Sequence, residues 1–234
     1  MPGAKFLGVD CCSVKAAEDQ INLDDVTART VGAFPVLNLL EQRVSLELYR
    51  LLAEGQAVPR GTLAQRLGIS VETVNGILDR WPGVFADSQR RIVGYWGLAL
   101  PAAYASPHKL TIRGRKLSAW CAWDTLFLPQ LLGQSAEIES ACPTQGTTVR
   151  LTVSPERVER VQPVGARMSF LLPDAAAVQK DVVSTFCHFI HFFASRQAGE
   201  SWAAQHSETF LLSIEEAYVL ARRKNELQYG EILP

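Results

Sequence analysis

The chain has 234 residues, which is enough for one large domain or two small ones. Hydrophobic residues make up 47% of it and charged residues 20%, as in an ordinary globular protein, and the net charge of −1 favours neither nucleic acid nor an anionic membrane as partner. Without a membrane-length apolar run or a secretory signal, we expect a cytoplasmic protein with no membrane contact.

The N-terminal residues are expected to form an extension followed by a helix. Residues 1–30 are polar and weakly periodic, so we interpret them as a flexible N-terminal extension. From 36 to 52 apolar residues recur at helical spacing, and Gly55 and Pro59 close that segment. The first regular element is therefore expected after the extension.

A helix-turn-helix with a β-ribbon is predicted next. Residues 61–68 and 71–80 have the pattern of two short helices, with Ser70 as N-cap of the second. The segments 84–85 and 91–98 are β-like. This order of elements resembles a winged helix-turn-helix.

The second of these short helices is a poor candidate for contacting DNA. Affinity for DNA depends heavily on Lys and Arg side chains that face phosphates. This helix offers Arg80 against Glu72 and Asp79. Winged helices also serve as packing modules, and a fold does not by itself decide a function. We give the charges more weight than the fold analogy and expect no nucleic-acid partner.

The second part of the chain mixes strands and helices after a linker at 102–107. Alternating or strongly apolar segments predict strands at 109–112, 136–140, 147–153, 168–172 and 187–193. Helical patterns cover the segment that carries Cys121 and ends at Gly133, and then residues 175–185, 201–206 and 213–227. Residues 142–146 are predicted to form a turn.

These elements predict an α+β fold. The domain boundaries that we expect are 1–30 for the flexible extension, 31–104 for a winged helix-turn-helix-like domain and 105–234 for a mixed α/β domain with small antiparallel sheets.

The cysteines indicate free thiols. The chain has five, an odd number without regular spacing: Cys11, Cys12, Cys121, Cys142 and Cys187. A zinc site built from the last three with His188 or His191 is an alternative, but the usual close cysteine pairs are absent. On a strand, His188 and His191 would also lie on opposite faces.

Cys121 and Asp124 are the most informative pair. Residues three apart on a helix share a face and can touch. A thiol reacts as its thiolate, and a neighbouring carboxylate can take its proton and later return one. Cys187 lies among phenylalanines, which raise the pKa of a thiol unless a partner compensates. From these residues alone, redox, zinc and Cys-His-Asp nucleophilic chemistry stay open, although no local pattern identifies a catalytic histidine.

Four segments resemble the signature of the bacterial organomercurial lyases, also called alkylmercury lyases. They agree with that family in order and approximate spacing, and the likeness extends over about residues 36–225. The segments are Ala119-Trp-Cys-Ala-Trp-Asp-Thr-Leu-Phe-Leu-Pro129, Cys142-Pro-Thr-Gln-Gly146, Val149-Arg-Leu-Thr-Val-Ser-Pro155 and Phe186-Cys-His-Phe-Ile-His-Phe-Phe-Ala-Ser195.

The resemblance implies protonolysis of carbon–mercury bonds, with a hydrocarbon and Hg(II) as products and mercuric reductase as the acceptor of Hg(II). By motif match, Cys121 and Cys187 correspond to the family's two catalytic cysteines and Asp124 to its catalytic aspartate, and these three residues would form the mercury site. Residues 105–234 would be the catalytic domain and residues 31–104 a packing domain. Cys142 matches a cysteine regarded as structural, while the Cys11–Cys12 extension has no clear counterpart. Some members have a second cysteine where this chain has His188.

Mercury is soft, and thiolate is the protein ligand that suits it. We therefore expect two thiolates on mercury and one aspartate as proton carrier, no resident cofactor, and external thiols for turnover. An apolar pocket around Trp120, Trp123 and the phenylalanines near Cys187 is expected to raise the pKa of Asp124. The alternatives are a winged-helix metal- or redox-sensing regulator and a non-catalytic, thiol-rich metal-binding protein.

Overall fold

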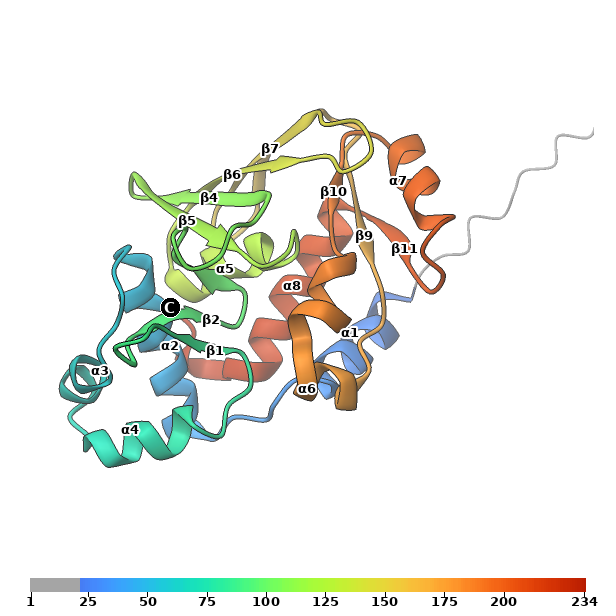
Figure 1. Cartoon of the computed structure of the whole chain (residues 1–234). Helices are drawn as coiled ribbons and strands as arrows, with labels where there is room; N and C mark the ends of the chain where they lie inside the picture. The colour runs from blue at the N-terminus through green and yellow to red at the C-terminus, as the bar shows by residue number, and fades with distance from the viewer. Residues whose placement is uncertain (1–21) are drawn as a thin grey trace, which may run out of the picture.

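The computed structural model describes residues 22–234, which form an α+β fold with two antiparallel sheets (Figure 1). The strands are β1 (Val84–Ala86), β2 (Ile92–Tyr95), β3 (Leu98–Ala99), β4 (His108–Ile112), β5 (Arg115–Ala119), β6 (Ala136–Ala141), β7 (Thr148–Val153), β8 (Val158–Gln162), β9 (Arg167–Phe170), β10 (Phe192–Phe193) and β11 (Phe210–Ser213). The larger sheet has the order β1-β2-β3-β5-β4-β6-β7-β8 and the smaller one β10-β9-β11.

Helices cover these sheets. They are α1 (Leu23–Gly32), α2 (Leu39–Ala53), α3 (Arg60–Leu67), α4 (Val71–Leu78), α5 (Asp124–Leu132), α6 (Ala175–Thr185), α7 (Arg196–Ala203) and α8 (Ile214–Tyr229), with short 3₁₀ turns η1 (Cys187–Phe189) and η2 (Gly230–Ile232). No helix among residues 22–234 is both long and apolar enough to cross a membrane.

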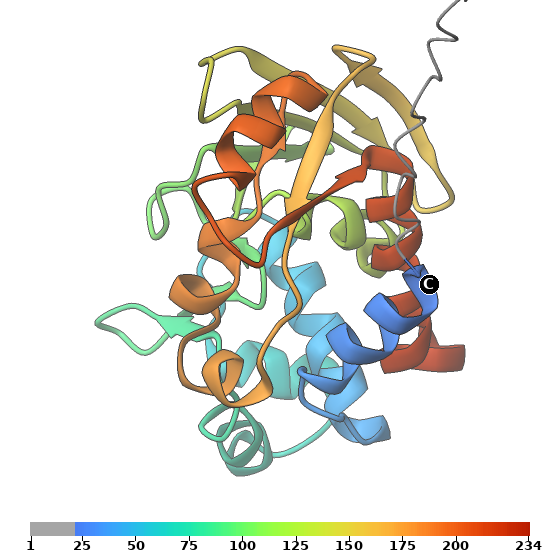
Figure 2. The same ribbon diagram turned by 90° about the vertical axis from the view of Figure 1, so that its right-hand side faces the viewer.

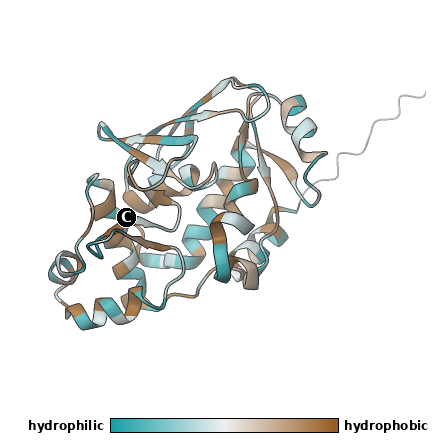
Figure 3. Ribbon diagram, in the orientation of Figure 1, coloured by the Kyte–Doolittle hydropathy of each residue, from teal (hydrophilic) through white to brown (hydrophobic). Residues whose placement is uncertain are grey.

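The helices expected in the first part of the chain are confirmed. Helix α2 begins at a capping box made by Asn38 and Glu41, and Ser70 accepts a hydrogen bond from the Thr73 N–H at the start of α4, as predicted. Outer helices such as α4 and α6 alternate hydrophilic and hydrophobic residues in Figure 3, as expected for helices with one buried face.

The expectation of a loose extension up to residue 30 is wrong for its last part. Helix α1 begins at Leu23, where the Asn22 side chain accepts hydrogen bonds from the N–H groups of Asp24 and Asp25. Helix α1 packs along α8, as Figure 2 shows. Helix α1 is therefore in contact with the far end of the chain. Cys11 and Cys12 lie outside the described residues.

The two parts of the chain share one sheet. Strands β1 and β2 pair as the predicted ribbon, but β3 then pairs with β5, so the larger sheet continues past the expected linker at 102–107. The assignment of residues 31–104 to a separate winged helix-turn-helix-like domain, ending before residue 105, stays a prediction.

In the second part, the predicted pairing of β6 with β7 is confirmed, and so is the turn after β6, where the Gly146 N–H donates to the Cys142 carbonyl at 2.8 Å. The strand expected at 187–193 is wrong. Cys187–Phe189 forms η1, and only Phe192–Phe193 pairs with β9. The apolar residues of this segment are buried because the segment packs into the core, and their apolar character does not require a strand.

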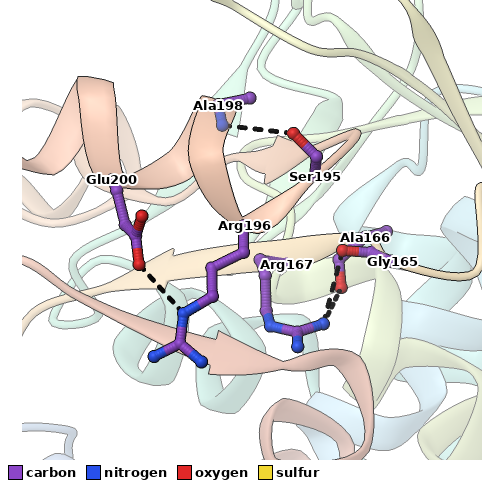
Figure 4. Close-up of polar contacts among 7 residues, drawn as sticks. All are labelled: Gly165, Ala166, Arg167, Ser195, Arg196, Ala198 and Glu200. Atoms are coloured by element: carbon purple, nitrogen blue, oxygen red, sulfur yellow. Dashed lines mark hydrogen bonds and ion pairs between the residues drawn. The ribbon is translucent and has the colours of Figure 1, made fainter. Parts of the chain in front are cut away.

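Local polar contacts lie beside the smaller sheet, at the start of α7 and of β9 (Figure 4). Ser195 caps α7 by accepting from the Ala198 N–H at 3.2 Å, and Arg196 pairs with Glu200 one turn later. On the neighbouring strand β9, the Arg167 guanidinium donates to the Ala166 carbonyl at 3.0 Å. The Ser195 cap thus fixes the start of α7, while the Arg196–Glu200 and Arg167–Ala166 contacts are local to their own elements.

Helix α5 lies in the core between the larger sheet and α8 (Figure 1). Eight of its nine residues are buried, and Gly133 ends it in the left-handed conformation with φ 61°. The Asn225 amide on α8 donates to the Phe127 carbonyl at 3.0 Å. Helix α5 is thus joined to α8, near the end of the chain.

Candidate active site

Cys121 does not lie on a helix, contrary to the expectation. Strand β5 ends at Ala119 and α5 begins at Asp124, so Cys121 belongs to the turn between them. The Asp124 side chain folds back over this turn, and its Oδ2 accepts a hydrogen bond from the Cys121 N–H at 2.7 Å. An acidic residue in the first turn also suits the helix dipole. The expected Cys121–Asp124 contact is therefore present, but a turn creates it.

Cys187 reaches the same place from the other side. Helix α6 is interrupted at Asp181, which has φ −161° and ψ 88°, and η1 then begins at Cys187. The Ala122 N–H, next to Cys121, donates to the Ile190 carbonyl at 3.1 Å. This backbone hydrogen bond ties the Cys121 turn to the η1 segment.

The result is a buried cluster of two thiols and one carboxylate. One ligand atom each from Cys121, Asp124 and Cys187 lie within 4.8 Å of one another, and both cysteines are free. At metal–sulfur distances of about 2.3 Å, as known for zinc, two sulfurs up to about 4.6 Å apart can share one ion. Within residues 22–234, Cys142, His188 and His191 do not join such a group, which argues against the zinc alternative.

Burial dominates the acid–base behaviour of the cluster. It raises the pKa of Asp124 to about 6, although the hydrogen bond from the Cys121 N–H acts in the opposite direction. Burial also raises the pKa of Cys121 well above its usual range. For Cys187, the hydrogen bond with Cys121 lowers the pKa, but burial and the nearby Asp124 outweigh it and the net shift is upward. Neither thiol therefore ionises readily without a base.

A small cavity of about 30 Å³ lies next to the cluster. As expected, Trp120 and Phe186 line it together with Asp124 and Cys187. Trp123 does not. It is fully buried behind the cavity, and its indole N–H donates to the Ala217 carbonyl of α8 at 3.2 Å.

Several residues that line the cavity were not predicted from the sequence, because they come from elements far apart in the chain. They are mostly aromatic or apolar side chains of the α1–α2 connection, α2, the α4–β1 turn, the β-ribbon and α8: Phe34, Pro35, Leu37, Tyr49, Trp81, Tyr95, Trp96, Gly97, Lys224, Gln228 and Tyr229. Periodicity marked some of these positions as buried, but no local signal indicated that they share a cavity with Cys187.

Gly97 is one of these residues and touches the carboxylate. It stands in the turn between β2 and β3 with φ +92°, and its carbonyl accepts from the Trp120 N–H at 3.0 Å. A Cβ at this position would lie 2.6 Å from Asp124 Cγ and Oδ1. Glycine has no Cβ and tolerates a positive φ, so it alone allows the turn to lie this close to the Asp124 carboxylate in this backbone conformation.

Lys224 is a buried lysine that lines the same cavity. Its side chain is packed over Phe127, with Nζ 4.1 Å from the ring centroid, and it donates to Asn225 Oδ1 at 3.3 Å. Burial lowers the pKa of Lys224 from 10.5 to about 7, although the charge of Asp124 acts in the opposite direction.

Replacing Lys224 by methionine is expected to change how stability depends on pH. Below pH 7 the folded wild-type protein bears the full cost of a buried ammonium. As the pH rises from about 7 towards 10.5, the folded form loses this proton before the unfolded form does. The unfolding free energy of the wild type should therefore rise relative to Lys224→Met, by up to about 1.4 kcal/mol per pH unit.

Denaturant unfolding at several pH values between 6 and 10 measures this difference. Lys180→Met, which removes an exposed lysine of α6, controls for the loss of one positive charge. A constant difference between wild type and Lys224→Met across this range would contradict the burial of a titrating amine at this position.

Comparison with known proteins decides the family. A family model described as MerB, alkylmercury lyase, matches residues 102–225. The alkylmercury lyase of Staphylococcus epidermidis is 43% identical over 175 residues, which cover 75% of this chain and 78% of that protein. The chain belongs to the alkylmercury lyase family.

Other alkylmercury lyases agree. That of Pseudomonas putida is 39% identical over 173 residues, covering 74% of this chain and 78% of that protein. The fold matches a crystal structure of the mercury-bound form of MerB2, with a TM-score of 0.68 and 22% identity over 88% of this chain and 98% of that one. Since the alkylmercury lyases are an enzyme family, an enzyme is favoured over a winged-helix regulator.

Two of the four segments that resemble alkylmercury lyases meet at the cluster. The first supplies Cys121 and Asp124, and the last supplies Cys187. The second segment holds Cys142, whose thiol contacts the Thr144 hydroxyl at 3.3 Å. The third segment ends at Pro155, whose carbonyl accepts from the Tyr218 hydroxyl of α8 at 3.0 Å. Two of the segments thus carry the reactive groups, and the other two make contacts elsewhere in the fold.

Proposed function

We propose that this protein cleaves carbon–mercury bonds of organomercurials by protonolysis, releasing a hydrocarbon and Hg(II). The observation that carries the proposal is the approach of Cys121, Cys187 and Asp124 to within 4.8 Å in a buried site. Two soft sulfur ligands suit mercury, and one carboxylate suits proton transfer. Membership of the alkylmercury lyase family supports the same reading.

The first step uses the contact between Asp124 and Cys121. The substrate arrives as R–Hg–SR′, with an external thiolate on mercury. Because burial raises the pKa of the Cys121 thiol, a base is needed, and a carboxylate oxygen of Asp124 lies within 4.8 Å of the Cys121 sulfur. Asp124 accepts the thiol proton, the Cys121 sulfur bonds to mercury, and R′S⁻ leaves with that proton as R′SH.

The second step adds Cys187. Asp124, again ionised, accepts the Cys187 proton, and this sulfur becomes the second thiolate on mercury. Two thiolates place electron density on the metal and weaken its bond to carbon. The electron pair of that bond then takes the proton from Asp124, giving R–H. Two thiol protons are consumed, R′SH and R–H leave, and Hg(II) stays bound to Cys121 and Cys187.

A pKa of about 6 suits Asp124 for both directions of transfer. At neutral pH the carboxylate is mostly ionised and can act as base, yet the acid form is close enough in free energy to donate its proton. The proposed reaction requires no resident cofactor, because mercury is substrate and product. External thiols remove Hg(II), and a mercuric reductase is the proposed next acceptor.

The test is product analysis. Purified protein with excess thiol and phenylmercury should release benzene, detected by gas chromatography, over many turnovers. Stoichiometric mercury binding without benzene would instead support a thiol-rich metal-binding protein. A gel shift of DNA that responds to Hg(II), again without benzene release, would support a regulator.

Replacing Gly97 by alanine is expected to lower the rate of benzene release about 100-fold, because the new methyl group displaces the Asp124 carboxylate. Steady-state kinetics with phenylmercury measure the loss. Gly114→Ala is the matched control, since Gly114 also has a positive φ of +74° but has no heavy atom within 4 Å of a Cβ placed there. Equal activity losses in the two variants would assign the effect to backbone strain rather than to Asp124.

A further inference from the structure

The proposed steps make no use of Lys224, although it lines the cavity beside Asp124 and Cys187. The residue is only 5% exposed, and its ammonium has a hydrogen bond to the Asn225 side chain and a contact with the Phe127 ring. Among residues 22–234, no carboxylate lies within ion-pair distance of it. Asp124 is near enough to interact with it by charge. A buried ammonium without a close counter-ion is costly unless a ligand supplies the missing charge.

A second hydrogen-bond donor of the cavity is also unused. Trp120 is 3% exposed, and its indole Nε1 has no hydrogen-bond partner within the described part of the chain. Trp120 lines the cavity together with Lys224. The Gln228 side chain lies there too, with an unpaired Oε1 and a weak bond from Nε2 to the Pro35 carbonyl at 3.4 Å. The cavity thus offers an ammonium and an N–H to a ligand that carries acceptor atoms.

The shape of the site places an organic group near Lys224. The inner cavity of about 30 Å³ is too small for an aromatic ring. A second pocket of about 210 Å³ adjoins it and shares Phe34, Pro35, Lys224 and Gln228 with it. A substrate with mercury at the sulfurs therefore extends its organic group past Lys224 towards this outer pocket.

Building on the proposed function, we propose that Lys224 makes the site selective for organomercurials whose organic group carries an anionic substituent such as a carboxylate. Lys224 lines both the inner cavity and the outer pocket and has no carboxylate within ion-pair distance among the described residues. A carboxylate on the substrate supplies the counter-ion, and the Trp120 N–H is available as a further donor. Lys224 is in this account a specificity-determining residue and takes no part in bond cleavage.

The test compares two substrates that differ only in charge. For phenylmercury and 4-(hydroxymercuri)benzoate, kcat/KM is measured in the wild type, Lys224→Met, Lys224→Arg and the exposed control Lys180→Met. The ratio of benzoate to phenyl activity should fall about 10-fold or more in Lys224→Met, mainly through the KM for the benzoate. Lys224→Arg should retain most of the ratio, and Lys180→Met all of it.

A ratio unchanged in Lys224→Met would overturn the inference, as would an equal loss for both substrates, which would assign Lys224 to the support of the fold or of Asp124. Lys224→Gln serves as a second neutral variant if the methionine variant does not fold by circular dichroism. Failure of the wild type to cleave either substrate would overturn the proposed function itself, whereas cleavage of phenylmercury with no dependence on Lys224 would overturn only this inference.

Discussion

Replacing Cys187 by serine is expected to abolish the release of benzene from phenylmercury while the protein stays folded. A hydroxyl is a hard ligand that is not ionised near neutral pH, so only Cys121 would remain as a soft ligand for mercury. Because the proposed cleavage depends on a second thiolate, the rate should fall about 1,000-fold or more, as for single members of concerted catalytic sets.

Gas chromatography of benzene and a titration of bound mercury give the two readouts for this variant. Cys142→Ser is the matched control, because the same atom is exchanged in a buried cysteine outside the cluster. The control should retain activity. Full activity of Cys187→Ser would remove Cys187 from the reaction and with it the two-thiolate mechanism.

Asp124→Asn is expected to separate mercury binding from hydrocarbon release. The amide has almost the same shape, and its oxygen can still accept from the Cys121 N–H. It cannot carry a proton between the thiols and carbon, and proton transfer by a positioned group contributes about 100- to 10,000-fold. Single-turnover experiments should show phenylmercury retained on the variant and benzene formed at least about 100-fold more slowly.

Loss of stability would not explain this result. Since the folded pKa of Asp124, about 6, lies above the ordinary 3.8, ionised Asp124 costs stability above pH 6, and asparagine removes that cost. Asp25→Asn, an exposed carboxylate in the first turn of α1, is the control for charge. Wild-type rates of benzene release from Asp124→Asn would exclude Asp124 as the proton carrier.

Local patterns in the sequence predicted much of the secondary structure. The Ser70 cap and the helical spacing of 36–52 are short-range signals, and the structure follows them. Strands β8 and β11 were not anticipated, and the strand expected at 187–193 is largely absent. The residues of these segments are compatible with more than one backbone conformation. Pairing with β7 makes a strand of β8, and pairing with β9 makes a strand of β11.

The sequence by itself determined the chemistry of the site: two cysteines, one aspartate and the motifs around them. Only the tertiary structure decided that these groups meet. Cys121 and Cys187 are 66 positions apart, and no local rule spans that separation. Their approach depends on the turn before α5, the break in α6 and the Ala122–Ile190 hydrogen bond. The burial of Lys224 and the close approach of Gly97 to Asp124 likewise arise from packing between distant elements. This packing determines the pKa of Lys224 and the shape of the cavity.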